Sequence, residues 1–291
     1  ISRVETCDMS EELKERMKAE ARFFRAFAYL ELTQYFGKVA IVTEELPYDA
    51  PNVPRNSLEE VRSFILDELA EILPESYNGG FMYESGRVTR YAALALRARA
   101  ALYFGNYAEA EKSAKAVMDS GKYSLFKLAS LSVAQEQEAK EMDLYIDFES
   151  LGIDKDKFIK GMFSYESLWQ GANATPANPE YVLTHEYMED PYAYDDSRYT
   201  YFLPLSMSIH HGYSSFEPMQ DLVDAYWSID GKTIPDKIPV ETRKANYEKI
   251  WNFAKGLSAE EYKAFATSPD LMAYDYMKEF KNRDSRLYVT L

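Results

Sequence analysis

The sequence predicts a mostly α-helical protein in which helix pairs pack against a loop-rich, irregular half with a few short strands. Up to residue 120, four segments place apolar side chains at helical spacing, each with a start or stop signal. Residues 130–160 are charged and helix-prone, with a weaker pattern. In residues 161–215 the periodicity is lost and Tyr, Asn, Pro, Gly and Ser predominate, which indicates long loops.

The first predicted helix covers residues 10–36, because Ser10 can cap its start and Gly37 can end it. Its apolar stripe is expected at Leu13, Met17, Ala21, Phe24, Phe27 and Ala28. After a proline-containing loop, Ser57 and Glu60 form a capping box that opens a second helix. The expected stripe of this second helix is Leu58, Val61, Ile65, Leu69 and Ile72.

A second helix pair is predicted over residues 89–104 and 106–120. Its first helix is rich in alanine, whose small side chain lets helices approach closely. The expected stripe of its second helix is Tyr107, Ala110, Ala114 and Val117. Gly105 begins a Gly-Tyr-Ala spacing typical of tetratricopeptide repeats. Since two repeat pairs cannot bury their own faces, we expect the rest of the chain to pack against them.

We therefore expect one integrated domain with two parts. Residues 1–128 form a helical scaffold, and residues 129–291 form a loop-rich, ligand-binding part packed on it. In the second part, short helices are predicted to begin at Pro218 and after Ser258, and a strand is expected just before Leu291. With neither an initiator methionine nor a signal peptide, the chain is interpreted as a fragment lacking both ends.

Composition limits the possible partners. The formal net charge is −15 and the isoelectric point is near 4.8, without the clustered Lys and Arg that nucleic acids require. The same acidity disfavours anionic lipid, so a membrane contact is not expected from the folded domain. Cys7 is the single cysteine, and an internal disulfide is therefore impossible. A neutral or cationic ligand remains compatible.

Catalytic and metal-binding patterns are not found. Gly231-Lys232-Thr233 resembles the end of a phosphate-binding loop, but Tyr226 stands where that loop needs its first glycine. We therefore predict no enzymatic activity, no cofactor and no metal. The residues that could still supply metal ligands or paired catalytic carboxylates are scattered and form no known motif. They are His185, His210, His211, Glu166, Glu180, Glu186, Asp190, Asp195 and Asp196.

The segment from Ala19 to Val39 is the most specific in the chain. It places Glu20, Arg22 and Arg25 among the aromatic positions of a helix, and buried charges need partners. Its order resembles the E-A-R-F-x-R-A-x-x-Y…F-G-x-V signature of the SusD/RagB-like proteins, outer-membrane nutrient-binding lipoproteins of the Bacteroidetes. The resemblance covers residues 19–128 and returns at 216–226, 230–232 and 281–288, where Ser285 replaces the family's usual proline.

The resemblance implies a function. In this family the repeat helices pack on a SusC-like TonB-dependent transporter, and the irregular half captures an oligosaccharide or a peptide outside the cell. The chain would then be a non-catalytic binding protein of the outer-membrane surface, held by a lipid anchor that this chain lacks. The alternatives are a helical-repeat scaffold for protein–protein contact and a glycan hydrolase.

Sugar recognition needs aromatic faces for stacking and polar side chains for hydroxyl groups. Such residues occur in the insertion between the first two helices and in the irregular or variable segments of the second half. Any one of them could instead belong to the core, which only burial decides. The predicted ligand-binding residues are Tyr48, Trp169, Asn173, Tyr194, Asp195, Tyr213 and Trp251.

Overall fold

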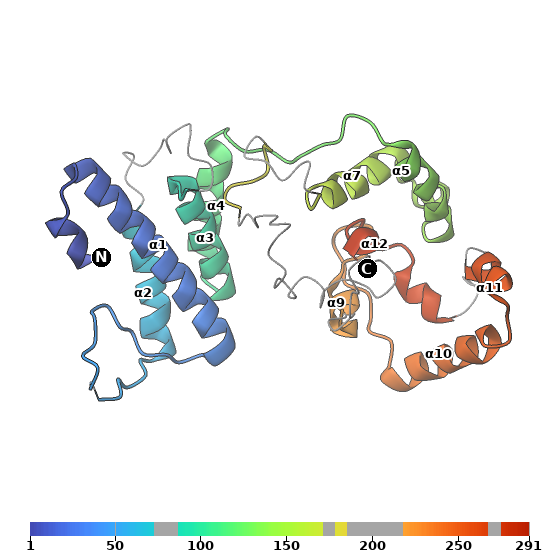
Figure 1. Cartoon of the computed structure of the whole chain (residues 1–291). Coiled ribbons are helices and arrows are strands. Elements are labelled where there is room, and N and C mark those ends of the chain that lie inside the picture. Colours follow the sequence, from blue (N-terminus) through green and yellow to red (C-terminus); the bar gives the residue numbers. More distant parts are fainter. Residues whose placement is uncertain (50, 73–86, 171–177, 185–217, 267–274, 291) are drawn as a thin grey trace, which may run out of the picture. The chain divides into compact units, whose positions relative to one another are not determined.

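A computed structural model describes the chain except for residues 50, 73–86, 171–177, 185–217, 267–274 and 291. The chain divides into two compact units (Figure 1): unit 1 is Ile1–Leu125 with Thr175–Met188, and unit 2 is Phe126–Ala174 with Glu189–Leu291. The described residues form helices joined by turns and loops, which confirms the mostly α fold. They contain no strand, only an isolated antiparallel bridge between Ser228 and Arg283. The expected short strands are therefore not found in the part of the chain that the structure describes.

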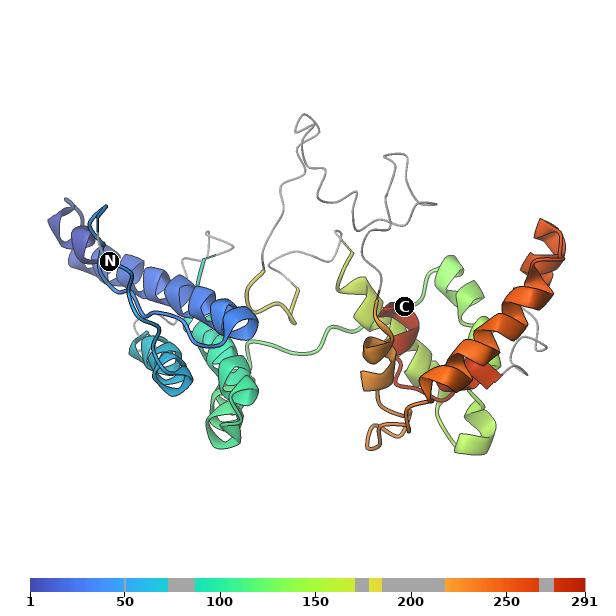
Figure 2. The same ribbon diagram turned by 90° about the horizontal axis from the view of Figure 1, so that it is seen from below.

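Unit 1 contains the predicted helix pairs, with ends close to those expected. Its helices are η1 (Ser2–Thr6), α1 (Glu11–Phe36), α2 (Leu58–Glu71), α3 (Arg90–Tyr103) and α4 (Tyr107–Asp119). Ser10 caps α1, and Ser57 with Glu60 makes both hydrogen bonds of the capping box on α2. In sequence order, each of the four α-helices packs on the next, and Figures 1 and 2 show them side by side.

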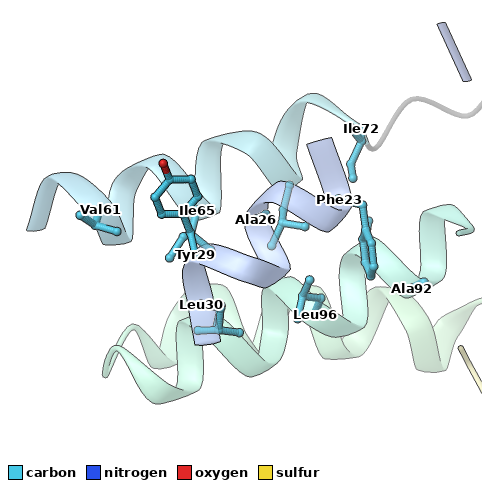
Figure 3. Close-up of a cluster of buried hydrophobic side chains, with 12 residues drawn as sticks. Phe23, Ala26, Tyr29, Leu30, Val61, Ile65, Ile72, Ala92 and Leu96 are labelled. Carbon is cyan, nitrogen blue, oxygen red and sulfur yellow. The ribbon is translucent and has the colours of Figure 1, made fainter. Parts of the chain in front are cut away.

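The buried face of α1 differs from the predicted stripe. Figure 3 shows Phe23 and Leu30 of α1 pointing toward Ile65 of α2 and Leu96 of α3. The buried set on α1 is Phe23, Ala26, Tyr29, Leu30 and Thr33, whereas Phe24 and Phe27 of the predicted stripe are exposed. Aromatic and aliphatic residues surround most of this helix, so periodicity alone could not identify its inner face.

The stripe predicted for α2 is confirmed, because Val61, Ile65, Leu69 and Ile72 are buried and Leu58 is half-buried. On α4 the prediction is partly wrong. Ala110 is buried, but Tyr107 and Ala114 are exposed. Ser113 takes the remaining buried place on α4, because its hydroxyl hydrogen-bonds to Glu109 at the seam with α3.

The charged residues of α1 have the partners that burial demands. Arg25 Nε donates to Glu68 Oε2 at 2.8 Å, and the Glu68 carboxylate of α2 is buried. Arg87, just before α3, donates two hydrogen bonds to Glu20, at 2.9 and 2.5 Å. The more exposed Arg22 lies 3.8 Å from Glu68. These pairs join α1 to α2 and to the segment that enters α3.

A second polar cluster joins the two helix pairs. Arg97 of α3 donates from Nε to Glu109 of α4 at 2.6 Å and from Nη1 to the carbonyl of Leu66 on α2. Ser113 also donates to Glu109, at 2.8 Å. The Arg97 guanidinium holds the pKa of the Glu109 carboxyl below its ordinary value. Because one side chain links α2, α3 and α4, the pairs stack as adjacent repeats.

Enlarging the α3–α4 seam should destabilise unit 1. We expect Ala110→Leu to cost about 1–3 kcal/mol in the free energy of unfolding, because Ala110 is buried where α4 packs on α3 and three more carbons would overpack that contact. Ala114→Leu is the matched control: it lies on the exposed side of the same helix, and we expect a change within about 0.5 kcal/mol. Thermal unfolding followed by far-UV circular dichroism measures both. Equal melting temperatures for the two variants would contradict the packing.

Unit 2 is more helical than its sequence pattern indicated. Its elements are α5 (Val133–Glu138), η3 (Glu141–Leu144), α6 (Phe148–Leu151), α7 (Lys155–Ser167), α9 (Gln220–Ala225), α10 (Val240–Ala254), α11 (Ala259–Ala266), η6 (Asp275–Phe280) and α12 (Leu287–Thr290). Its core clusters around Met142, Ile146, Phe148, Ile159, Met162 and Phe163.

Four expectations about these elements are corrected. The loop predicted from residue 161 begins later, because α7 buries Met162 and Phe163 through Ser167. Helix α10 was not predicted, since its apolar residues are sparse. Helix α9 begins at Gln220, two residues beyond the predicted start at Pro218. The segment before Leu291 is the short helix α12 rather than a strand. Leu287 is buried and the adjacent, half-buried Tyr288 also packs against the core of unit 2, whereas adjacent residues of a strand point to opposite faces.

Candidate ligand-binding site

An aromatic pocket lies between α10 and α11 of unit 2. Its volume is about 520 Å³, and it is lined by Tyr247, Glu248, Ile250, Trp251, Lys255 and Tyr262. Trp251 is 69% exposed and Tyr262 is 51% exposed, so both rings present area to solvent rather than to the core. We call this hollow the aromatic pocket.

Helix periodicity and one capping box bring these side chains together. Tyr247, Trp251 and Lys255 are spaced four residues apart and share one face at the end of α10. The chain turns at Gly256, and Ser258 then caps α11 through reciprocal hydrogen bonds with Glu261, at 2.8 and 3.3 Å. This box sets where α11 begins, and thereby places Tyr262, whose amide donates to the Ser258 carbonyl at 2.8 Å.

The two helices of the pocket are also held by ring packing. Phe253 of α10 and Phe265 of α11 lie with ring centroids 4.7 Å apart. Ile250 and Phe265 pack with Phe280 of η6 in a small apolar cluster. These contacts anchor α10 to α11 and to η6.

A buried ion-pair network fixes α10 within unit 2. Arg243 of α10 donates to Glu279 Oε2 at 2.7 and 3.0 Å and to Asp224 Oδ1 at 2.9 Å. All three side chains are buried.

Burial and the nearby Glu279 charge raise the pKa of Tyr247, so its phenol stays protonated near neutral pH and can both donate and accept hydrogen bonds.

The motif at residues 281–288 is part of this support. The Arg283 guanidinium donates to three carbonyl groups, those of Glu279, Val223 and Tyr226, at 2.6–2.7 Å. Tyr288 donates to the carbonyl of Phe280 at 2.8 Å. Arg283 is buried, and its contacts tie η6 and α12 to α9. The motif therefore stabilises the unit.

The structure describes three of the seven predicted ligand-binding residues. Trp251 lies in the aromatic pocket, on a helix rather than in the irregular segment expected. Trp169 follows α7, is 74% exposed and makes an edge contact with Tyr165 at 6.0 Å between ring centroids. Tyr48 is fully exposed in a loop of unit 1. The other four lie outside the described residues: Asn173, Tyr194, Asp195 and Tyr213.

Two aromatic residues of the pocket were missed by the sequence analysis. Tyr247 stands one helical turn before Trp251, and Tyr262 stands four residues after the Ser258 cap. The available signal was an aromatic pair at four-residue spacing followed by a capping box. That signal was overlooked because α10 itself was not predicted.

A second hollow lies within unit 1, between α1, α3 and the segment Val182–Thr184. Its volume is about 670 Å³, and its walls include Phe23, Phe24, Phe27 and Leu96, with Arg99 as the charged residue. We call it the α1–α3 groove. It contains the exposed phenylalanines that the first helix was expected to bury.

Two further features are not found among the described residues. There, no three His, Cys, Asp or Glu side chains gather in a way that could hold a metal ion. None of the described helices combines the length and the apolarity that a bilayer-spanning segment needs.

The architecture defines a class of protein: stacked helix pairs in one unit, and a second helical unit that carries an aromatic pocket. Family comparisons agree with this class. Residues 179–291 match the model described as "SusD family", and residues 1–102 match the model described as "Starch-binding associating with outer membrane". Both ends of the chain are therefore SusD-like, which confirms the resemblance carried by the motifs.

One solved structure supports the fold, and two others align over smaller parts of the chain. A SusD-like protein from Bacteroides fragilis aligns with a TM-score of 0.58 and 24% identity, over 82% of this chain and 41% of its own. A SusD-like carbohydrate-binding protein from the same species (TM-score 0.38, 23% identity) covers 50% of this chain and 26% of its own. Surface glycan-binding protein A from Bacteroides uniformis (0.37, 24%) covers 41% and 27%. No curated protein matches the chain. The chain thus spans about two fifths of the first of these proteins.

Proposed function

We propose that this chain belongs to a non-catalytic binding protein that captures an oligosaccharide at the cell surface. The observation that carries the proposal is the aromatic pocket, with Trp251 and Tyr262 exposed at its walls on a SusD-like chain. Family members described as carbohydrate-binding and glycan-binding support the ligand class.

The physical argument rests on how sugars bind. The C–H face of a sugar ring stacks on an aromatic ring, and its hydroxyl groups bond to polar side chains at the rim. The pocket offers both, since Trp251 and Tyr262 supply faces and Glu248 and Lys255 supply polar groups. Helices hold the rings, so little ordering entropy is lost when a ligand binds.

The further steps follow from the family. We propose that the full-length protein is anchored by a lipid at the outer-membrane surface and delivers its ligand to a SusC-like TonB-dependent transporter. We also propose that the ligand leaves unchanged, because no nucleophile–base arrangement is found in the sequence. Trp169 and Tyr48, both exposed, remain proposed as additional ligand contacts.

Removing the pocket's largest ring should weaken binding. We expect Trp251→Ala to cost about 1–3 kcal/mol in affinity for an oligosaccharide that the wild-type chain binds, with little loss of stability because the ring is 69% exposed. Isothermal titration calorimetry and thermal unfolding measure the two quantities. Tyr107→Ala, which removes an exposed ring in unit 1, is the control.

A third variant locates the site if the pocket is the wrong one. Should Trp169→Ala weaken binding while Trp251→Ala leaves it intact, the ligand site lies at the end of α7. Turnover of the oligosaccharide during the titration would instead favour the hydrolase alternative.

The α1–α3 groove favours a second candidate function, a helical-repeat scaffold that binds an apolar peptide. Three phenylalanines and Leu96 line it, and helix-paired grooves commonly receive peptides. A peptide array probed with the wild-type chain tests this function. Peptide binding that Phe24→Ala and Phe27→Ala abolish, with no oligosaccharide binding, would favour the scaffold.

A further inference from the structure

We infer that the aromatic pocket selects neutral oligosaccharides over both acidic and amino-sugar oligosaccharides. This inference rests on the proposed function and names the substrate class of the same site. It follows from two opposite charges that the pocket presents without neutralising either of them.

The two charges are Glu248 and Lys255, one at each end of the Trp251 turn of α10. Lys255 Nζ donates to the neutral Asn252 amide oxygen at 3.0 Å. Among the described residues, neither Glu248 nor Lys255 takes part in an ion pair. The pocket therefore offers one donor cation and one acceptor anion beside the exposed indole.

A charged ligand gains at one of these groups and loses at the other. A uronate carboxylate would be attracted by Lys255 but repelled by Glu248, and a protonated amino sugar would meet the reverse. The formal net charge of −15 adds a repulsive field for an acidic chain. The two local charges thus give neither class of charged ligand a net gain. The overall charge further disfavours an acidic chain, and it attracts a cationic one only at long range, where salt screens it.

A neutral hydroxyl group satisfies both residues. Each hydroxyl can accept from the Lys255 ammonium and donate to the Glu248 carboxylate, so a ring stacked on Trp251 can meet both charges with hydroxyls. Hydrogen bonds to charged groups are stronger than those between neutral groups. Glu248 and Lys255 therefore favour the binding of uncharged, hydroxyl-rich rings. The apolar walls, including Ile250 and Tyr262, take the C–H faces.

The test compares three classes of probe by isothermal titration calorimetry with the wild-type chain. The neutral probes are maltohexaose, laminarihexaose and mannohexaose; the acidic probe is an oligogalacturonate; the amino-sugar probe is a chitosan oligomer. We expect at least one neutral probe to bind, with an affinity that barely changes with salt. We expect Glu248→Gln and Lys255→Met each to weaken it roughly tenfold.

We expect the same variants to change which class of oligosaccharide probe the chain prefers. Glu248→Gln should improve binding of the oligogalacturonate relative to the neutral probe, and Lys255→Met should improve binding of the chitosan oligomer. Trp251→Ala should weaken every probe, since stacking does not depend on charge.

The failure of the inference differs from the failure of the proposed function. Tighter binding of the acidic or the amino-sugar probe by the wild-type chain, lost with salt and dependent on Trp251, would overturn the selectivity and keep the site. If none of the three classes binds, or if Trp251→Ala binds as the wild type does, the proposed function itself is wrong.

Discussion

Replacing Arg243 with methionine should destabilise unit 2 by about 3–5 kcal/mol. Arg243 is the only cation within the described residues that hydrogen-bonds to both Asp224 and Glu279, and both carboxylates are buried. Methionine fills a similar volume but removes the buried cation from two buried carboxylates, and only weaker partners remain: Gln220 at Glu279 and the exposed Lys237 at Asp224. Breaking a buried ion pair on one side costs more free energy than the intact pair contributes. Urea unfolding followed by tryptophan fluorescence measures the effect, because all three tryptophans lie in unit 2.

Lys237→Met is the matched control. Lys237 is largely exposed and also approaches Asp224, at 3.8 Å. An exposed pair contributes about 0–1 kcal/mol, so we expect a small change in the free energy of unfolding. Comparable losses for the two variants would show that burial of the Arg243 network does not anchor α10. The Arg243 variant should also weaken oligosaccharide binding, because α10 carries Trp251.

Truncating Phe163 should lower the free energy of unfolding by an amount similar to that expected for the Arg243 variant. Phe163 is 1% exposed and lies in the core of unit 2 beside Met162 and Ile159, so we expect Phe163→Ala to lower the free energy of unfolding by about 3–5 kcal/mol. The cost combines the lost burial of the ring with the cavity it leaves. The same fluorescence-detected urea titration measures it.

Tyr262→Ala supplies the comparison in the same unit. Its ring is 51% exposed, so stability should change by less than about 1 kcal/mol, whereas oligosaccharide affinity should fall. The reverse pattern, with a stable Phe163 variant and an unstable Tyr262 variant, would place residues 161–167 outside the core. It would restore the loop that the sequence pattern indicated there.

The helix boundaries were the part of the fold that the sequence predicted best. Ser10, Ser57 and Ser258 cap their helices as predicted, because a cap depends on groups within three residues of each other. The seam between α3 and α4 was also predictable, since Ala110 of the expected stripe is small and is buried there. The charges of the α1 motif have the buried partners that desolvation requires, although the sequence could not say which.

The candidate site was less predictable from the sequence. Of its rings, only Trp251 was chosen from sequence, on the expectation of an irregular segment. Tyr247 and Tyr262 can be assigned to the pocket only when it is known that the chain turns at Gly256 and brings α10 and α11 together. A sequence shows that a ring is present, but exposure depends on which neighbours cover it.

The sequence by itself determined the helix starts of unit 1, the pairing of its helices and the SusD-like motifs, because these depend on local hydrogen bonds and short-range periodicity. Only the tertiary structure decided which face of α1 is buried, that residues 161–167 belong to a core helix, and that three aromatic rings share one pocket. The physical reason is the same in each case: burial is set by contacts between residues far apart in the chain, and an amphipathic pattern with more than one apolar face does not specify them.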